Sequence, residues 1–500
     1  MKKYFYSLPI VLALFACSDD SIDGVHTDIE PYFDVNELYQ EYSLYWKPSD
    51  GWVGDPMPMY ANGAYQVFYL HDARDGAPTY HPIYHASTTD FLTYTDNGEA
   101  IPTGEDGSQE DALGTGSFIE KDGIYYGFYT AHNDRGNPKE KIYLATSTDL
   151  KTWTKQTDFS LQAADGYDAD EFRDPFVYKD GSVYRMLVTT RGYVAAVNDW
   201  QAVIANYTSA DLQKWEIQEP YYYNGERILE CPDVFAIGNY EYLVYSNWDW
   251  ANANRRVLYR YRQSGSAEWE VPDNDVLDGY AFYAGKTASD GNKRYLFGWT
   301  ATRENHSDAN NYNWAGNLVV HQLLQNTDGT LRVTVPETIV AGIGNSVSLK
   351  TSTLANTTVS DSNTFTMNAS GGTAIATFDK LKGIHRIEAN INPGSATQFG
   401  FDFGLGGIRS KKISILLDIS AKTITCNAVD NGTVTAVLNT ATLPTADSYD
   451  VTIVIENSVC VVYLNGTTAF SNRIYSMNQN AWGIRTLDGQ ATFKLNLYKK

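Results

Sequence analysis

Apolar and polar residues alternate in short runs along most of the chain, and many of these runs end at a glycine-containing turn. This alternation is typical of half-buried β-strands joined by hairpins. No long window keeps the 3.6-residue period of an amphipathic helix. The pattern therefore predicts an all-β fold.

A turn followed by an aromatic strand recurs along the first two thirds of the chain. The turns share a glycine, and successive glycines lie 60, 58, 57 and 53 residues apart: Gly63, Gly123, Gly181, Gly238 and Gly291. A second motif, in which Asp lies two or three residues after a Ser and precedes an apolar residue, is interleaved at 87–94, 147–153 and 209–215, where the Asp side chain would cap a turn. Repeated hairpin units of this length are typical of four-stranded propeller blades. We predict a five-bladed β-propeller over residues 35–340.

The composition changes after Pro336. Residues 337–500 lose most of their tryptophan and gain Thr, Ser and Asn, while apolar strands continue, as at 413–419 and 451–455. Asn465-Gly466 is a hairpin turn signal, but the blade repeat is absent. We predict a separate C-terminal β-sandwich over residues 341–500, with 341–356 as the connection.

The amino terminus has the features of an export signal. Lys2 and Lys3 precede an apolar run, 4–16, that is too short to span a bilayer and ends at Cys17. Ala16-Cys17 resembles a bacterial lipoprotein cleavage site, and 18–20 (Ser-Asp-Asp) resembles the surface-export signal of Bacteroidetes lipoproteins. We expect a signal peptide over 1–17 with a lipidated Cys17, a leader over 18–34, and an outer-membrane lipoprotein that faces the cell exterior. A plain secretory signal with a chance cysteine is the alternative.

Charge and cysteine content narrow the possible partners. Acids outnumber bases 60 to 38, for a net charge of −22, which argues against nucleic acid and against a polyanionic substrate. The remaining cysteines, Cys231, Cys426 and Cys460, form an odd set without a disulfide framework. Cys426 and Cys460 could pair, but their alternating apolar surroundings favour buried thiols. No Cys/His spacing indicates a metal site, no cofactor is expected, and the oligomeric state stays open.

Three carboxylates share one position in the repeat. Asp55 and Glu230 lie 8 residues before their hairpin glycines, and Asp174 lies 7 before its own. Inner strands of a propeller line its axis, so these side chains should converge and raise one another's pKa. Thr115 and Tyr283 occupy the same offset in the other two blades. Each acid alone could be a turn residue, but the shared offset favours a paired-carboxylate site for glycosidic bond cleavage.

The chain resembles glycoside hydrolase family 32, the invertase, inulinase and levanase family. The resemblance covers nearly the whole mature chain. The family's Trp-Met-Asn-Asp-Pro-Asn-Gly motif is similar to 52–58 (Trp-Val-Gly-Asp-Pro-Met-Pro), and its Arg-Asp-Pro and Glu-Cys motifs are intact at 173–175 and 230–231. Further matches are 116–117, 282–284, 298–299, 314–316 and, in the sandwich, Arg473-Ile474-Tyr475.

The resemblance implies residue roles. Asp55 would be the nucleophile that forms a covalent fructosyl-enzyme, Glu230 the general acid and then base, and Asp174 a transition-state stabiliser that holds fructose hydroxyls. The reaction would retain configuration, and a fructan or fructo-oligosaccharide would be the substrate, with endo-acting cleavage of levan expected. The resemblance also implies a set of substrate-binding positions: Trp52, Ser117, Arg173, Cys231, Tyr283 and Trp314.

Departures from the family pattern concern the substrate more than the catalytic acids. Gly54 replaces the Asn before the nucleophile, Met57-Pro58 replaces Asn-Gly, and Leu70 stands where the family usually has Gln. Each lost hydrogen bond to the substrate would cost about 1–3 kcal/mol, and His71 or Asp72 could compensate. The alternatives are an exo-acting inulinase or invertase, an inverting arabinan or xylan hydrolase with a five-bladed fold, and a non-catalytic fructan-binding lipoprotein. Hydrolysis and fructosyl transfer are not distinguished.

Overall fold

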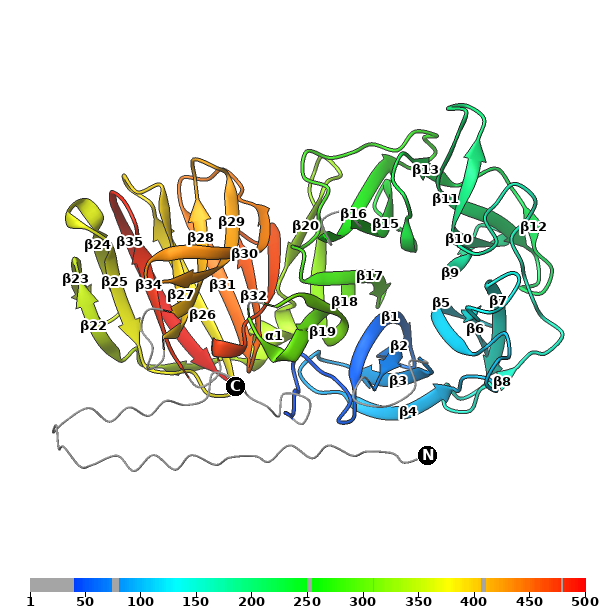
Figure 1. The fold of residues 1–500 in the computed structure, drawn as a ribbon, viewed down its shortest axis with the longest axis horizontal. Coiled ribbons are helices and arrows are strands. Elements are labelled where there is room, and N and C mark those ends of the chain that lie inside the picture. Colours follow the sequence, from blue (N-terminus) through cyan, green and yellow to red (C-terminus); the bar gives the residue numbers. More distant parts are fainter. Residues whose placement is uncertain (1–39, 74–80, 250–253, 309, 406–410, 478–479) are drawn as a thin grey trace, which may run out of the picture.

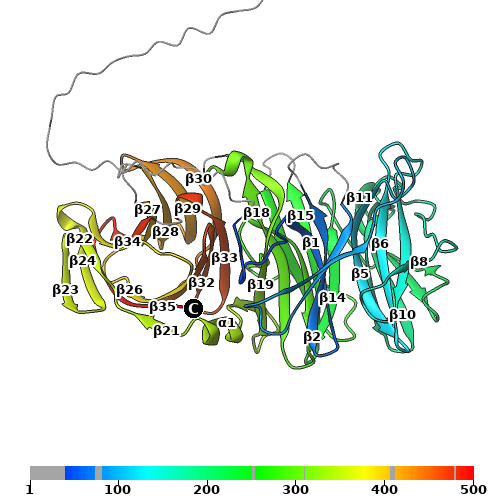
Figure 2. The same ribbon diagram turned by 90° about the horizontal axis from the view of Figure 1, so that it is seen from below.

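The protein is nearly all β, as predicted, and consists of a propeller beside a β-sandwich (Figures 1 and 2). The computed structural model describes residues 40–73, 81–249, 254–308, 310–405, 411–477 and 480–500. The predicted signal peptide, Cys17 and the leader lie outside the described residues. Within the described ranges, no helix has the length and apolar character needed to cross a membrane.

The described strands of the propeller form five antiparallel groups, each of which begins with an inner strand. The first three groups are β1 (Trp52–Ala61), β2 (Ala64–Asp72), β3 (Ile83–Thr88) and β4 (Thr95–Ile101); β5 (Ala112–Lys121), β6 (Ile124–His132), β7 (Glu140–Ser147) and β8 (Thr154–Lys155); and β9 (Arg173–Asp180), β10 (Val183–Val194), β11 (Asp199–Ser209), β12 (Glu216–Ile217) and β13 (Tyr222–Asn224). The last two are β14 (Glu230–Ile237), β15 (Tyr240–Asp249) and β16 (Asn254–Gln263); and β17 (Phe282–Ser289), β18 (Arg294–Arg303), β19 (Tyr312–Gln325) and β20 (Leu331–Thr334).

The inner strands close into a ring. β1, β5, β9, β14 and β17 contact one another in that order, and β17 contacts β1 again. The last group is joined to the first by the pairing of Val53 with Gly316 between β1 and β19. The segment before β1 reinforces this closure, because Leu318 N donates to Trp46 O at 2.9 Å. This arrangement is consistent with the five blades expected from the repeat.

The turns have the conformations that the repeats predict. All five hairpin glycines have a positive φ, between 56° at Gly238 and 93° at Gly291, which glycine adopts without steric cost. In the second motif, Asp149 Oδ1 accepts hydrogen bonds from the backbone N–H groups of Lys151 and Thr152 at 2.8 and 2.7 Å. These bonds hold the pKa of Asp149 at about 2. The predicted capping role is therefore confirmed.

The second unit is a sandwich of two antiparallel sheets, preceded by α1 (Glu337–Gly342). One sheet contains β21 (Asn345–Val347), β23 (Thr357–Asp361), β24 (Thr364–Asn368), β26 (Ile384–Asn392), β31 (Tyr449–Glu456), β32 (Val459–Leu464), β33 (Thr468–Arg473) and β35 (Gln490–Lys499). The other contains β22 (Thr351–Ala355), β25 (Ala374–Phe378), β27 (Gln398–Leu405), β28 (Lys411–Asp418), β29 (Thr423–Asp430), β30 (Thr433–Thr442) and β34 (Ala481–Thr486). Both sheets contribute to one apolar core, in which Cys426 and Cys460 are buried free thiols.

The sandwich and the propeller share an apolar core at their interface. Leu318 and Val320 of the propeller belong to the same buried cluster as Val459, Val461 and Tyr463 of β32. Figure 2 shows β32 and β33 beside β18 and β19. Burial of apolar surface stabilises by about 25 cal/mol per Å², so separating the two units would expose a large apolar face.

A fully buried arginine fastens the two units together. Arg473, at the end of β33, donates to the carbonyl oxygens of Thr300 at 2.9 Å and Ala301 at 3.1 Å in β18, and to Asn317 Oδ1 at 2.5 Å in β19. Asp278 of the propeller accepts from Ser471 N at 2.7 Å. Hydrogen bonds to charged groups contribute about 1.5–3 kcal/mol each, so this polar contact fixes the orientation of the sandwich.

Deleting the sandwich should make the propeller insoluble. A chain of residues 18–340 would expose the apolar cluster shared with β32, and we expect it to aggregate while the full chain remains soluble. The measurement is soluble yield and size-exclusion profile. As a control, Arg473→Met in the full chain should stay soluble and lower the melting temperature. A soluble, fully active 18–340 fragment would contradict the prediction.

Candidate active site

The inner strands of the five groups share a local irregularity near their first residues. The pairing with the next strand shifts between Gly54 and Met57, Gly114 and Gly116, and Glu230 and Asp233, and similar shifts occur in the other two groups. Such bulges bend a strand and redirect side chains. At these bulges Asp55, Asp174, Cys231 and Ala284 have positive φ values of 29°, 58°, 52° and 54°. Left-handed residues other than glycine are uncommon and gather at functional sites.

Asp55 is held by donors from two other blades. Thr115 Oγ1 donates to Asp55 Oδ2 at 2.6 Å, and Trp299 Nε1 donates to Asp55 Oδ1 at 2.9 Å. Burial raises the pKa of Asp55, and the charge of Glu230 raises it further, while the two hydrogen bonds lower it; the net shift is upward. The carboxylate is therefore fixed in orientation and lies within electrostatic range of Glu230.

Glu230 is bound at both oxygens. Arg173 Nη2 donates to Oε1 at 2.9 Å, and the Tyr283 hydroxyl donates to Oε2 at 2.5 Å. Its side chain is 20% exposed, so a ligand can reach it. A tyrosine hydroxyl can also accept a hydrogen bond, so the contact with Tyr283 suits both the charged and the protonated carboxyl.

Asp174 is the most deeply buried of the three acids, with 3% of its surface exposed. Cys231 N donates to its Oδ2 at 2.9 Å, and its own N–H donates to Thr130 Oγ1 at 2.9 Å. Burial raises the pKa of Asp174 to about 7, because the lowering effect of Arg173 is opposed by the charges of Glu230 and Asp55. The structure thus brings together the three acids that the repeat offset predicts.

Arg173 is held by acids that sequence reasoning missed. Its Nη1 donates to Glu171 Oε2 at 2.5 Å and to Glu140 Oε2 at 3.3 Å. Glu140 is buried on β7 and also accepts from Phe172 N at 2.7 Å. These contacts fix the guanidinium beside Glu230. Glu140 belongs to a different blade from Arg173, and no motif links it to the site.

Arg255 on β16 is a second residue that the sequence did not indicate. Its guanidinium carbon lies 5.1 Å from the ring centre of Trp299 and 5.8 Å from that of Tyr283, the residues that donate to Asp55 and Glu230. Its Nη1 donates to Asn313 O at 2.6 Å. Burial lowers the pKa of Arg255, and the negative charges of Asp55 and Glu230 oppose this effect. Arg255 therefore adds positive charge behind the donors of the two acids.

Most of the other predicted residues lie within or behind this group. Cys231 contributes its backbone N–H to Asp174, and its thiol is buried, which raises its pKa. Ser117 Oγ accepts from Val177 N at 2.8 Å and so links β5 to β9. Trp52 is 1% exposed, with Lys47 Nζ 4.8 Å from its ring centre. Ser117 and Trp52 are thus engaged with the protein itself.

Two of the departures from the family pattern, Gly54 and Leu70, lie beside Trp314, which is itself one of the family matches. A Cβ atom at Gly54 would lie 2.2 Å from the ring of Trp314, so a side chain at this position would require the ring to move. Leu70 is the cross-strand partner of Gly54 and belongs to a buried apolar cluster against which Trp314 packs. His71 Nε2 lies 3.0 Å from Asp50 Oδ1, and its ring stacks on Tyr84. Trp314 therefore occupies the space that an Asn at position 54 would need.

The described part of the chain holds no group of three or more His, Cys, Asp or Glu residues that could bind a metal ion. The site consists of carboxylates, a guanidinium, hydroxyls and indoles. These groups can donate and accept protons, attack an electrophilic carbon and bind sugar hydroxyls.

Comparison with protein-family models decides the family. The model "Glycosyl hydrolases family 32 N-terminal domain" matches residues 45–334, and "GH32, BT1760-like, C-terminal domain" matches residues 329–495. The chain belongs to glycoside hydrolase family 32. The predicted resemblance is thereby confirmed over both units.

Curated relatives of this family 32 chain act on fructose-containing sugars according to their names. A raffinose invertase of Escherichia coli is 29% identical over 57% of this chain and 62% of its own length, and a fructan 1-exohydrolase of Triticum urartu is 28% identical over 61% and 54%. The chain thus spans only part of the length of these relatives.

Solved structures confirm the fold. An exo-inulinase from Aspergillus awamori has a TM-score of 0.72 at 15% identity, covering 93% of this chain and 99% of that one. A family 32 β-fructofuranosidase of Bombyx mori has a TM-score of 0.69 at 18% identity, covering 93% and 94%.

The buried Asp174 should destabilise the fold at neutral pH. Its pKa is about 7 when folded against 3.8 for an unperturbed aspartate, so the unfolded chain loses this proton first and stability falls as pH rises from about 4 to about 7. Asp174→Asn should therefore raise the free energy of unfolding at pH 8 by a few kcal/mol, roughly 4 at about 1.4 kcal/mol per pKa unit. Denaturant unfolding at pH 4 and pH 8 measures this. A gain that is equal at both pH values would contradict it.

Proposed function

We propose that this chain is a retaining β-fructosidase that cleaves fructans through a covalent fructosyl-enzyme. The observation that carries the proposal is the convergence of Asp55, Glu230 and Asp174 at the bulged ends of three inner strands, each bound by donors from elsewhere in the ring. Family membership and the names of the curated relatives support cleavage of a β-fructosidic bond.

In the proposed first step, Asp55 attacks the anomeric carbon of fructose while Glu230 gives a proton to the departing oxygen. Trp299 and Thr115 hold the two oxygens of Asp55 and so direct its attack. In the second step, Glu230 takes a proton from water, which then releases fructose from Asp55. Arg173 and Tyr283 each bind one oxygen of Glu230 and so hold its carboxyl in place for both steps.

Asp174 has a different role in this proposal. It is buried and receives the Cys231 N–H, so it is positioned to accept hydrogen bonds from fructose hydroxyls and to stabilise positive charge on the sugar ring. Two alternatives from the sequence, an inverting hydrolase and a non-catalytic binding protein, do not use this reaction and can be distinguished from it. An inverting enzyme would place water between the carboxyls, and a binding protein would not depend on Asp55.

We further propose that cleavage is endo-acting and that levan is the polymer. A lipid-anchored enzyme outside the cell meets polymers before import, and internal cleavage yields oligosaccharides that a transporter can take up. Trp314 fills the space where a polar contact to a terminal fructose would otherwise lie beside Gly54, which suits a site that does not require a chain end. The choice of levan over inulin rests on the resemblance to surface fructanases.

Removing either reacting carboxylate should abolish turnover. Asp55→Ala and Glu230→Ala should each lower kcat by several orders of magnitude, because nucleophile and general acid act only in the chemical step. Activity on levan, inulin, sucrose and arabinan is the measurement, with NMR of the first-formed anomer to test retention. Asp122→Ala, at an exposed hairpin acid, is the control and should retain full activity. More than about a tenth of the activity in both variants would refute the assignment.

The products of early digestion test the mode of attack. Wild-type enzyme on levan should release oligosaccharides of mixed length before free fructose accumulates, as chromatography of a time course would show. Inulin should be cleaved more slowly than levan. Fructose as the only early product would refute endo-cleavage, and faster cleavage of inulin would refute the linkage preference.

A further inference from the structure

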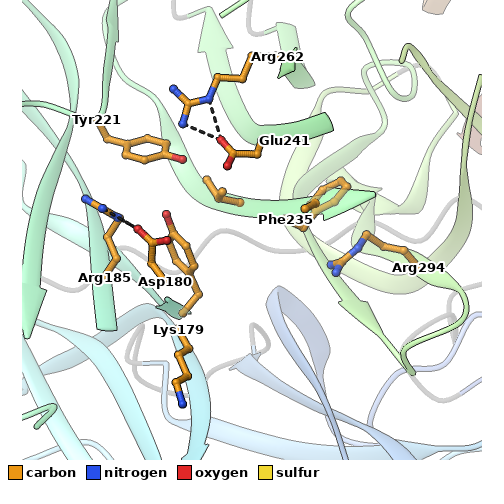
Figure 3. A pocket seen from close by; sticks show the side chains of 11 residues that line it. Lys179, Asp180, Arg185, Tyr221, Phe235, Glu241, Arg262 and Arg294 are labelled. Atoms are coloured by element: carbon orange, nitrogen blue, oxygen red, sulfur yellow. Dashed lines mark hydrogen bonds and ion pairs between the residues drawn. The ribbon is translucent and has the colours of Figure 1, made fainter. Parts of the chain in front are cut away.

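A pocket lies at the opposite end of the inner strands from the carboxylates. It has a volume of about 350 Å³ and opens between the third and fourth groups of strands (Figure 3). Asp174 lies near the start of β9 and Asp180 ends it, six residues later. At about 3.3 Å per residue, the pocket is roughly 20 Å from the catalytic acids. It is therefore a separate site.

Two ion pairs supply acceptors to this pocket. Arg185 Nη2 binds Asp180 Oδ2 at 2.6 Å, and Arg262 Nη2 binds Glu241 Oε2 at 2.7 Å. The bonds of each carboxylate to its arginine end on one oxygen only. The second oxygen of each carboxylate can therefore accept a hydrogen bond from a ligand (Figure 3).

Donors and an apolar surface complete the lining. The guanidinium carbon of Arg294 lies 4.3 Å from the ring centre of Phe235, and its Nη1 donates to Thr287 Oγ1 at 2.7 Å. Figure 3 shows this guanidinium on the wall opposite Tyr221. The remaining N–H groups of Arg294 are donors, and the rings of Phe235 and Tyr221 provide apolar surface.

This alternation of donors, acceptors and aromatic rings selects the class of ligand. A sugar hydroxyl both donates and accepts, so it can bind between a guanidinium and a carboxylate oxygen. Lys179 and Arg294 add positive charge to the two ion pairs, so charge alone does not exclude an anion such as phosphate. An anion only accepts hydrogen bonds, however, and would leave the second oxygens of Asp180 and Glu241 without a donor. We propose that the pocket is a second saccharide-binding site, which holds a segment of polysaccharide away from the catalytic acids.

The identity of the sugar as a fructan rests on the proposed function. A polymer bound at this pocket would have its other segments concentrated near the enzyme, since linked binding sites raise the effective concentration of one another's ligand. A disaccharide is too short to bridge roughly 20 Å. The site would therefore affect binding of polymers and long oligosaccharides but not turnover of sucrose.

The test fills the pocket without removing any of its polar contacts. Ala236 lines the pocket and is exposed, so Ala236→Trp should block it. Calorimetric titration of Asp55→Ala protein with a levan oligosaccharide should reveal two sites, and Asp55→Ala/Ala236→Trp should retain one. The matched control is Ala210→Trp, at an exposed turn of the third group of strands, which should retain both. Glu241→Gln should weaken the second site at least several-fold without unfolding the protein.

Each outcome separates this proposal from the catalytic one. Equal stoichiometry with and without Ala236→Trp, or no second site, would overturn the saccharide pocket even if wild-type enzyme cleaves levan. Loss of one site on Ala236→Trp would support the pocket even if no fructan is cleaved. A last titration uses inorganic phosphate in place of the sugar. Phosphate binding that Ala236→Trp abolishes would overturn the assignment to a neutral sugar.

Discussion

Three carboxylates are enclosed by one ring of strands, where they repel one another and lose hydration. Much of the structure around them supplies hydrogen bonds that offset these two costs. Asp55, Glu230 and Asp174 each receive hydrogen bonds, but the donors differ in strength. Glu230 has a guanidinium and a hydroxyl, whereas the contact that Asp174 accepts from Cys231 is a neutral backbone N–H. Burial raises the pKa of Asp174 to about 7, because the charges of Glu230 and Asp55 oppose the lowering effects of Arg173 and of this N–H. The bulges at the strand ends supply the backbone groups that make such contacts possible.

The donors come from blades other than those of the acids they bind, so the site exists only in the closed ring. Trp299, which donates to Asp55, is followed on β18 by Thr300 and Ala301, whose carbonyl oxygens accept from Arg473 of the sandwich. The sandwich therefore supports the strand that carries a donor to the proposed nucleophile. Arg473 lies in a motif shared with the family, and its buried contacts give a physical reason for an arginine at that place.

The sequence was sufficient to predict the features that repeat along the chain or that depend on neighbouring residues. Five glycine turns indicated the propeller, and a common offset from those turns was enough to identify Asp55, Asp174 and Glu230. Contacts between blades could not be found in this way. Glu140 and Arg255 approach the site from strands whose local pattern contains no signal for it. Contacts between blades form only when the ring closes. No local pattern in a single sequence marks which residues will then meet.

Gly54 and Leu70 lie 16 positions apart in the sequence, yet they are cross-strand partners on β1 and β2. The indole of Trp314 occupies the space above Gly54, and Leu70 belongs to the buried cluster against which this indole packs. An amide at position 54 would collide with the ring, and an amide at position 70 would be buried in apolar surroundings without a demonstrated partner. The two departures from the family pattern are therefore neighbours in space, and both lie beside Trp314. They remove two amides from the surroundings of Trp314 and leave the hydrogen bonds that Asp55 accepts from Thr115 and Trp299 in place.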